Sequence, residues 1–473
     1  MKISFIAGEV APYATSGGLG DVMSALPTCL AENCENQVEV IAPLYGGIKP
    51  EYRARLKHLV DYSFKLSWRD TGASAYYLEE AGVRYIFIEN HYYFDRPAFY
   101  GAHDDAERFA FFSKAALELY IARGEAPDIL HANDWQAAMA IVYLKTIYSE
   151  CSLLSGIKTV YTIHNIEHQG KFDPYILGDV YGLGEEYLGL MTFGNSINLM
   201  KAAIETCDYL TTVSETYAHE LEYDYYAFGL DNVIKSARSK MTGIINGIDY
   251  TYFSPAKDKE IVKAYSARMV KSGKEKNKIA ICERLGLDTD PSIPLLVMIT
   301  RLATQKGIDL FLRVSEEILN NKVQVIILGT GEEKYEKSLK AIEANHSNMR
   351  ALIEFDRKLS KQLYASADLF LMPSKFEPCG LSQMIACSYG ALPIVRLVGG
   401  LKDTIIPHPV DGSNGFGFDN YNAHEMLSTI EYALSVYQNE KEWKAIRSRA
   451  LSSNFSWSNS AAKYLYIYNS ILN

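Results

Sequence analysis

Three stretches of the sequence place charged or polar residues directly after an apolar, strand-like run. In TRLATQKG, Arg301 and Lys306 flank a short loop that precedes a helical pattern. Arginine offers a planar fork of donors and lysine a compact charge, so together they suit a diphosphate. Two solvated cations are the alternative. Cations are less expected at a helix start, because the helix dipole favours anions there, and an anionic ligand would resolve that conflict.

The stretch LMPSKFEPCGLSQM places Glu377 in a loop after a second apolar run, and Cys379 and Gly380 open the next helix. The first turn of a helix leaves its backbone N–H groups unpaired, so Gly380, Leu381 and Ser382 could bind a phosphate or sugar oxygen. Glu377 would accept hydrogen bonds from neutral hydroxyl groups. The alternative is a plain helix start in which the glutamate complements the helix dipole.

The stretch TIHNIEHQG contains the spacing H-x-x-E-H, from His164 to His168, which fits an inverted zinc-protease motif. That motif needs a helix, so that both histidines share one face. These residues instead follow a β-branched strand pattern and precede a glycine. We therefore expect no zinc site, and place His164 at a strand end that faces a cleft. A buried structural histidine is the alternative.

The stretch HANDWQA places Asp134 and Trp135 after another predicted strand. An aromatic ring can cover the apolar face of a sugar while a carboxylate binds its hydroxyl groups. We therefore expect both residues to take part in sugar recognition, with a core tryptophan as the alternative.

The stretch YATSGGLGDV, residues 13–22, predicts a loop that leads into a helix N-terminus. Gly17 and Gly18 allow close approach of the backbone, and backbone N–H groups can bind an anion. A phosphate loop usually supplies a cation as well, yet the nearest lysine is Lys2. The stretch is therefore either an anion site without its cation or only a turn.

The elements that must position these residues follow an alternating pattern. Apolar runs separated by helical patterns predict βαβ units and an open, doubly wound parallel sheet, and the alternation restarts near residue 291. We expect an N-terminal domain at 1-249, a C-terminal domain at 250-455 and a helix at 456-473 that packs back on the N-terminal domain. A charged helical stretch, Asp258 to Lys278, is expected just after the crossover.

Composition narrows the class of protein. The 473 residues exceed one ordinary core, and the net charge of −10 argues against a nucleic-acid partner. Seven dispersed cysteines without a C-x-x-C pair favour reduced thiols in the cytosol, so we expect a cytoplasmic protein. No apolar run reaches the length of a membrane span, no P-loop motif occurs, and Asp288 to Asp290 makes a poor metal site.

These motifs, together with GIINGIDYTYFSP, TTVSETYA and YGALPIVRLVGGLKDTI, run nearly end to end through the chain. In them the chain resembles the bacterial glycogen synthase and plant starch synthase family. The resemblance implies an α/β fold of the GT-B type, with two Rossmann-like domains facing across a cleft. It also implies transfer of glucose from ADP-glucose to the non-reducing end of an α-1,4-glucan with retention of configuration, without a metal or cofactor. The oligomeric state is left open.

The resemblance also implies roles for individual residues. The implied catalytic residues are His164, Arg301, Lys306 and Glu377. The implied donor-binding residues are Thr15, Gly17, Gly18, Asp21, Asn246, Phe355, Cys379, Gly380, Leu381 and Ser382.

Two positions depart from the family pattern. The family has Lys-Thr-Gly-Gly-Leu where this chain has Thr15 to Leu19, and it often has a tyrosine where this chain has Phe355. Both positions touch the donor, so a UDP-glucose-dependent synthase is one alternative, and a catalytically weakened glucan-binding homologue is another. The implied catalytic residues, which are His164, Arg301, Lys306 and Glu377, are all retained, and this argues against the second alternative.

The departure at Thr15 leads to a prediction. Thr15→Lys should lower the KM for the nucleotide sugar, because it restores a cation beside the twin glycines that can attract the diphosphate. Initial rates at fixed glucan and increasing nucleotide sugar measure this constant. An unchanged or raised KM in a folded variant would count against the prediction.

Overall fold

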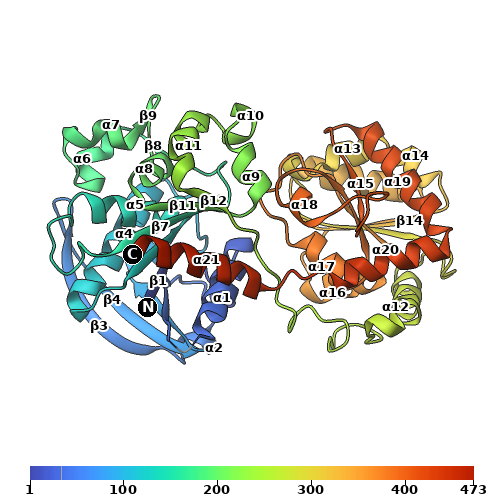
Figure 1. The fold of residues 1–473 in the computed structure, drawn as a ribbon, viewed down its shortest axis with the longest axis horizontal. Helices are drawn as coiled ribbons and strands as arrows, with labels where there is room; N and C mark the ends of the chain where they lie inside the picture. Colours follow the sequence, from blue (N-terminus) through green and yellow to red (C-terminus); the bar gives the residue numbers. More distant parts are fainter. Residues whose placement is uncertain (34) are drawn as a thin grey trace. The chain divides into compact units, whose positions relative to one another are not determined.

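The computed structural model describes residues 1–33 and 35–473, which divide into two compact units (Figure 1). The first unit comprises Met1–Asn246 together with Trp457–Asn473, and the second comprises Gly247–Ser456. Each unit has its own parallel sheet and its own buried apolar core. The α/β fold class with two Rossmann-like domains is confirmed.

In the first unit the described residues form a nine-stranded sheet in the order β12-β11-β7-β6-β1-β2-β5-β4-β3. The run from β12 to β5 is parallel, whereas β4 and β3 add antiparallel strands at one edge. The strands are β1 (Lys2–Ile6), β2 (Gln37–Pro43), β3 (Lys57–Leu66), β4 (Arg69–Glu80), β5 (Val83–Glu89), β6 (Ile129–Asn133), β7 (Lys158–Ile163), β11 (Tyr209–Thr212) and β12 (Met241–Gly243).

Helices pack against this sheet in groups that are far apart in sequence. Helix α5 contacts both α4 and α8, and α1 contacts the C-terminal helix α21. The helices of this unit are α1 (Gly18–Ala31), α2 (Pro50–Arg53), α3 (His91–Phe94), α4 (Asp105–Arg123), α5 (Asp134–Lys145), α6 (Ile176–Tyr181), α7 (Leu188–Met191), α8 (Leu199–Thr206), α9 (Glu215–Glu220), α10 (Asp224–Ala227), α11 (Asp231–Ala237) and α21 (Trp457–Leu472). A small antiparallel sheet joins β8 (Lys171–Phe172), β10 (Ser196–Asn198) and β9 (Thr192–Phe193).

The second unit is a parallel sheet in the order β15-β14-β13-β16-β17-β18. The chain moves outward from β13 to β15, then returns to β16 on the other side, so the order reverses between β13 and β16. The strands are β13 (Leu295–Ile299), β14 (Gln324–Leu328), β15 (Met349–Leu352), β16 (Leu369–Met372), β17 (Leu392–Arg396) and β18 (Phe416–Phe418). The helices are α12 (Val270–Leu285), α13 (Ile308–Arg313), α14 (Ser315–Leu319), α15 (Glu333–Asn345), α16 (Arg357–Ser366), α17 (Ser382–Ser388), α18 (Gly399–Thr404), α19 (Ala423–Tyr437) and α20 (Glu440–Ser452).

The predicted helix from Asp258 to Lys278 is wrong in its first half. Helix α12 begins only at Val270, and the segment before it is irregular. Asp258 accepts a hydrogen bond from the Tyr389 hydroxyl at 2.5 Å, and the Tyr265 hydroxyl donates to the carbonyl of Tyr389 at 2.8 Å. Burying these two side chains holds the segment against the unit, and this tertiary packing overrides the local preference for a helix.

A buried polar chain fixes the C-terminal helix to the first unit. On strand β6, His131 is fully buried, and its Nδ1 lies 2.7 Å from the hydroxyl of Tyr468 on α21. Its Nε2 lies 2.5 Å from the Thr162 hydroxyl, which in turn lies 2.5 Å from the hydroxyl of Thr211. Each buried polar atom of the histidine thus has a partner, as an imidazole removed from water requires.

Among the described residues, no helix combines the length and the apolar character that crossing a bilayer requires.

The buried histidines lead to a prediction about pH. Burial lowers the pKa of His131 to about 3, with a further contribution from His164, and burial lowers the pKa of His164 to about 3. Both imidazoles are therefore neutral in the folded protein at pH 5, whereas the unfolded chain binds a proton at each below about pH 6.5. Lowering the pH from 7 to 5 should reduce the free energy of unfolding by about 2 kcal/mol for each of these histidines. Burial raises the pKa of Asp134 to about 7, so this acid gains a proton in the folded state over the same range and offsets part of the loss.

Thermal unfolding at pH 7 and pH 5 measures the loss. In His131→Gln the difference between the two midpoints should shrink by several degrees, because one histidine no longer titrates. His103→Gln removes an exposed histidine and serves as the control. Equal pH sensitivity in wild type and His131→Gln would contradict the assignment.

Candidate functional site

The candidate residues of the first unit surround the point where its strand order reverses, between β1 and β6. Ligand sites of open parallel sheets form at such points, beyond the carboxyl ends of the strands. The Asn133 amide at the end of β6 donates to the carbonyl of Ile6 at the end of β1 at 3.4 Å. This contact holds the two strand ends together.

Glu9, which the sequence analysis did not single out, organises the glycine loop after β1. Its carboxylate is buried, with 4% of the residue exposed, and accepts hydrogen bonds from the backbone N–H groups of Ser16 at 2.6 Å and Gly17 at 3.1 Å. The hydroxyl groups of Ser16 and Tyr100 donate to its other oxygen at 2.6 and 2.9 Å. Two amides of the predicted anion loop are therefore already paired with a carboxylate.

The remaining predicted residues of this loop lie around the start of α1. The Thr15 hydroxyl donates to the carbonyl of Gly17 at 3.1 Å, and helix α1 begins at Gly18. A Cβ added at Gly17 or Gly18 would meet nothing within 4 Å, so the space beside both glycines is open. Asp21 lies exposed in the first helical turn.

At the carboxyl ends of β6 and β7, Asn133 and Asp134 position His164. The Asn133 amide nitrogen donates to two carbonyls, so its Oδ1 is the atom 3.0 Å from the Nε2 of His164. That nitrogen must then carry the proton, which leaves Nδ1 as an acceptor. Asp134 Oδ1 accepts the backbone N–H of His164 at 2.8 Å, and burial raises the pKa of Asp134 to about 7. Asp134 is thus a positioning residue for His164 in this structure.

Two other predicted residues of the first unit are buried. Trp135 is 9% exposed and packs its ring against Phe109 and Phe172, at centroid distances of 4.9 and 5.9 Å. Little of the ring face is left for a sugar. Asn246 is 5% exposed, and its Oδ1 is a buried acceptor without a hydrogen-bond partner among the described residues.

In the second unit, the chemistry again lies where the strand order reverses, between β13 and β16. Lys306 and Glu377 form an ion pair at 2.6 Å, with side chains 17% and 8% exposed. The hydroxyl of Ser374 donates to the same glutamate oxygen, Oε2, at 2.9 Å. This arrangement fixes the carboxylate and leaves Oε1 for another donor. Ser374 is three residues before Glu377, a spacing that was visible in the sequence but not used.

The loops after β13 and β16 are joined through their backbones. The N–H of Lys375 donates to the carbonyl of Gln305 at 2.8 Å, and the Gln305 amide donates back to the carbonyl of Phe376 at 3.3 Å. The guanidinium of Arg396 binds the carbonyls of Lys375 and Asp419 from β17. The ion pair is therefore held between two fixed loops.

Glycine is required where these loops approach most closely. A Cβ at Gly307, whose φ is +73°, would overlap the carbonyl of Pro373, and a Cβ at Gly399 would overlap the carbonyl of Glu377. An overlap at Gly307 would push apart the loops that carry Lys306 and Glu377, and one at Gly399 would displace the Glu377 loop from the start of α18 (Gly399–Thr404).

The other predicted residues of the second unit lie along the same edge of the sheet. Arg301 is exposed just beyond β13. The Phe355 ring, after β15, is 81% exposed, whereas Cys379 is 6% exposed. Leu381 and Ser382 are half-buried at the start of α17.

No group of three or more potential ligand side chains that could hold a metal ion occurs among the described residues.

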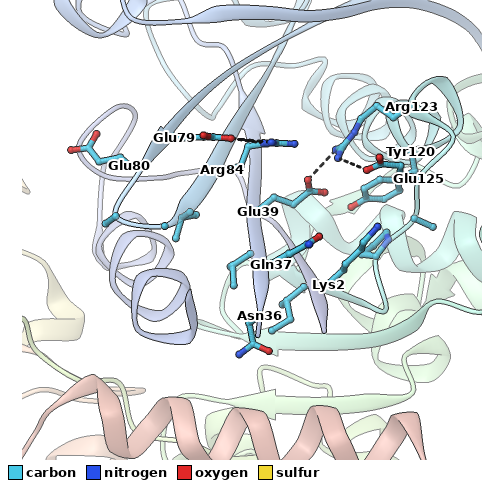
Figure 2. Close-up of a pocket in the computed structure, with 17 residues that line it drawn as sticks. Lys2, Asn36, Gln37, Glu39, Glu79, Glu80, Arg84, Tyr120, Arg123 and Glu125 are labelled. Carbon is cyan, nitrogen blue, oxygen red and sulfur yellow. Dashed lines mark hydrogen bonds and ion pairs between the residues drawn. The ribbon is translucent and has the colours of Figure 1, made fainter. Parts of the chain in front are cut away.

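A cavity of about 760 Å³ lies at the opposite edge of the first sheet, near the amino ends of β1, β2 and β5 (Figure 2). Its arginines are paired: Arg123 lies 2.9 Å from Glu39, and Arg84 lies 2.9 Å from Glu79. The charges there satisfy one another, so this cavity is not the candidate catalytic site.

Comparisons with known proteins cover both units. A family model described as the starch synthase catalytic domain matches residues 2–236, and one described as glycosyl transferases group 1 matches residues 284–449. A glycogen synthase of Ligilactobacillus salivarius is 40% identical over 100% of both chains. A glycogen synthase of Clostridium beijerinckii is 42% identical over 99% of this chain and 98% of that one.

A solved structure is also similar over the whole chain. It is the catalytic domain of Starch Synthase IV from Arabidopsis thaliana bound to ADP and acarbose, with 33% identity and a TM-score of 0.91 over 99% of each chain.

The role of Glu9 can be tested without assuming a reaction. In Glu9→Gln, one of the two oxygens becomes an N–H group that faces other donors, so the loop amides lose a charged acceptor. We expect amide hydrogen exchange at Ser16 and Gly17 to accelerate roughly tenfold or more.

Tyr100→Phe is the matched control, because it removes one donor to Glu9 and leaves both loop amides paired. Unchanged protection at Ser16 and Gly17 in Glu9→Gln would refute the assigned role.

Proposed function

This chain belongs to the glycogen synthase and starch synthase family, and we propose that it transfers glucose from ADP-glucose to the non-reducing end of an α-1,4-glucan with retention of configuration. Membership makes it a glucosyltransferase acting on a glucan. The observation that carries the finer proposal is the fixed cluster of Lys306, Glu377 and Ser374, with Arg301 at the same strand end.

The cluster suits a departing nucleoside diphosphate. Lys306 has three N–H donors and gives one to Glu377, so two remain for diphosphate oxygens. Arg301 would add a planar fork of donors. These cations would stabilise the negative charge that develops on the leaving group, which is where electrostatic catalysis contributes most. The proposed step therefore relies on side-chain cations and needs no metal.

Glu377 would bind and position the glucose unit. Lys306 and Ser374 both donate to Oε2, which leaves Oε1 to accept a hydrogen bond from a sugar hydroxyl. The bond between the anomeric carbon and the phosphate oxygen would break as the acceptor hydroxyl oxygen bonds to the same face of that carbon. The acceptor proton would pass to the departing phosphate. This route retains configuration without a protein nucleophile, and the protein contributes orientation and charge stabilisation.

His164 would contribute as a neutral group. Its pKa of about 3, lowered by burial, keeps the imidazole uncharged at physiological pH. Because Nε2–H is donated to Asn133, Nδ1 would accept a hydrogen bond from a hydroxyl of the transferred glucose. We assign His164 to sugar orientation rather than to proton donation.

The donor base is the least constrained part of the proposal. The similar starch synthase was solved with ADP bound, which supports ADP-glucose. UDP-glucose is the second candidate, because Thr15 replaces the family lysine and Phe355 offers an exposed ring without a hydroxyl.

The other proposed donor contacts are Gly17, Gly18, Asp21, Asn246, Cys379, Gly380, Leu381 and Ser382. Asp134 and Trp135 are proposed to support the acceptor side as positioning residues, since Asp134 binds the backbone of His164 and the Trp135 ring is buried. We propose that the reaction takes place in the cytoplasm.

A donor competition tests the proposal. The protein is incubated with glycogen and either ADP-glucose or UDP-glucose in the presence of EDTA, and nucleotide release is measured. We expect a higher kcat/KM with ADP-glucose, no loss of rate in EDTA, and new linkages whose anomeric proton signals are those of α-1,4-glucan.

Lys306→Met provides the control, since loss of one leaving-group cation should lower kcat by about 100-fold or more. No nucleotide release from either donor would overturn the assigned reaction, a preference for UDP-glucose would overturn the donor, and β-linked product would overturn retention. Dependence of the rate on a divalent cation would contradict the metal-free step.

A further inference from the structure

A second cavity, of about 580 Å³, lies in the second unit between helix α12 and the pair α19 and α20. Asp368, which lines it, precedes β16, and Pro291 and Ser292 precede β13. The cavity is therefore near the amino ends of the strands whose carboxyl ends carry Arg301 and Glu377. It does not belong to the proposed glucosyltransfer site.

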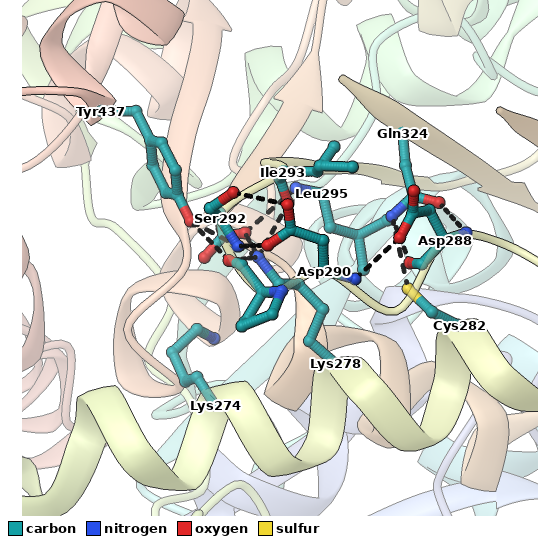
Figure 3. A network of polar contacts seen from close by, with 12 residues as sticks. Lys274, Lys278, Cys282, Asp288, Asp290, Ser292, Ile293, Leu295, Gln324 and Tyr437 are labelled. Carbon is teal, nitrogen blue, oxygen red and sulfur yellow. Dashed lines mark hydrogen bonds and ion pairs between the residues drawn. The ribbon is translucent and has the colours of Figure 1, made fainter. Parts of the chain in front are cut away.

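The floor of this cavity is a tightly bonded network (Figure 3). The Lys278 ammonium binds the carboxylate of Asp368 at 2.7 Å and the carbonyls of Pro291 and Ile293 at 2.8 and 2.9 Å. One turn earlier on α12, the Lys274 ammonium binds only backbone carbonyls, those of Tyr364, Ala365 and Tyr389. Lys274 is 2% exposed, and the structure gives it no carboxylate partner among the described residues.

Arg447, on α20, differs from the other residues that line the cavity in its hydrogen bonding. The residue is 9% exposed, yet no hydrogen bond or ion pair of its guanidinium occurs within the described part of the chain, and its Nε is a buried donor without a partner. The indole N–H of Trp443, one turn earlier on the same helix, is likewise buried and unpaired among the residues described. A buried cation that lacks an acceptor costs free energy, so the guanidinium of Arg447 points to an acceptor that binds there.

The charges of the lining favour an anion. Six lysines and arginines line the cavity against three carboxylates, Glu275, Asp368 and Glu440. Two of these carboxylates form ion pairs, Asp368 with Lys278 at 2.7 Å and Glu440 with Lys271 at 2.5 Å. The remaining cations of the lining are Arg268, Lys274, Lys444 and Arg447, and the one remaining carboxylate is Glu275.

The cavity of the first unit provides a comparison within the same molecule. It is larger, and it too is lined by arginines, but each of those is paired with a glutamate. Unpaired donors are therefore a particular property of the cavity beside Arg447. All its unpaired polar atoms named above are N–H donors, which matches the phosphate group, because phosphate oxygens only accept. A neutral sugar would need acceptors as well.

We propose that this cavity is a binding site for a small molecule carrying a phosphate monoester, with the phosphate held by the guanidinium of Arg447 and by Lys444. The organic part would lie against Tyr437 and Trp443, whose rings meet edge to face at a centroid distance of 4.9 Å. The volume holds a phosphorylated metabolite and not a polymer.

Thermal unfolding and titration calorimetry of the full chain test the site, with inorganic phosphate, ribose 5-phosphate and ribose as probes. Ribose 5-phosphate at 10 mM should raise the unfolding midpoint by about 2 °C or more, since a ligand that binds only the folded state stabilises it. Ribose should have no effect. If inorganic phosphate raises the unfolding midpoint as much as ribose 5-phosphate does, the site recognises the phosphate group alone. The assignment of the organic part to Tyr437 and Trp443 is then wrong.

The matched variants are Lys444→Met and Lys441→Met. Both change an exposed lysine of α20, but only Lys444 lines the cavity. We expect Lys444→Met to weaken binding about three- to tenfold and Lys441→Met to leave it unchanged. Arg447→Met should abolish binding without lowering the unfolding midpoint of the free protein, because it removes an unpaired buried donor.

Arg301→Gln separates this site from the strand end that carries Arg301, and it should bind the probes as the wild type does. The proposal would be overturned if Arg301→Gln lost binding while Lys444→Met and Arg447→Met kept it. The phosphate would then bind at the carboxyl ends of the strands, beside Arg301. A wild type that responds to neither phosphate probe would also overturn it.

Discussion

A carboxylate that is removed from water must find hydrogen-bond donors, and this requirement shapes the loops of both units. Glu9 and Glu377 are 4% and 7% exposed, and each follows a strand next to the reversal of its sheet. Glu9 is satisfied by the backbone amides of Ser16 and Gly17, whereas Glu377 is satisfied by the ammonium of Lys306. In each unit the buried acid therefore helps to fix the position of a glycine-containing loop.

The two ways of pairing a buried carboxylate leave different groups available to a ligand. In the first unit, the amides paired with Glu9 are no longer available to a ligand, so an anion there must be bound by the groups that follow in α1. In the second unit, the lysine that satisfies Glu377 keeps two donors for a ligand. In the proposed reaction, the positive charge beside the leaving group would come from Lys306 and Arg301, since the chain has no lysine at Thr15.

The sequence predicted the parallel strands well, because strands buried on both faces appear as continuous apolar runs. It did not predict the hairpin β3 and β4, whose half-exposed side chains give a weak pattern. The placement of His164, Lys306 and Glu377 at strand ends followed from the alternation of elements. Their partners did not follow from it. Asn133 contacts His164 across 31 residues, and Ser374 contacts Glu377 within one loop, and neither contact has a characteristic spacing.

The C-terminal helix has a consequence for how the protein is made. Because α21 belongs to the first unit, the second unit is an insertion within the first. The two ends of the insertion lie side by side, because the N–H of Ile248 donates to the carbonyl of Phe455 at 2.8 Å. During synthesis, every residue of the second unit leaves the ribosome before Tyr468 can reach His131. The domain that begins the chain is thus the last to be completed, and the inserted domain can fold first.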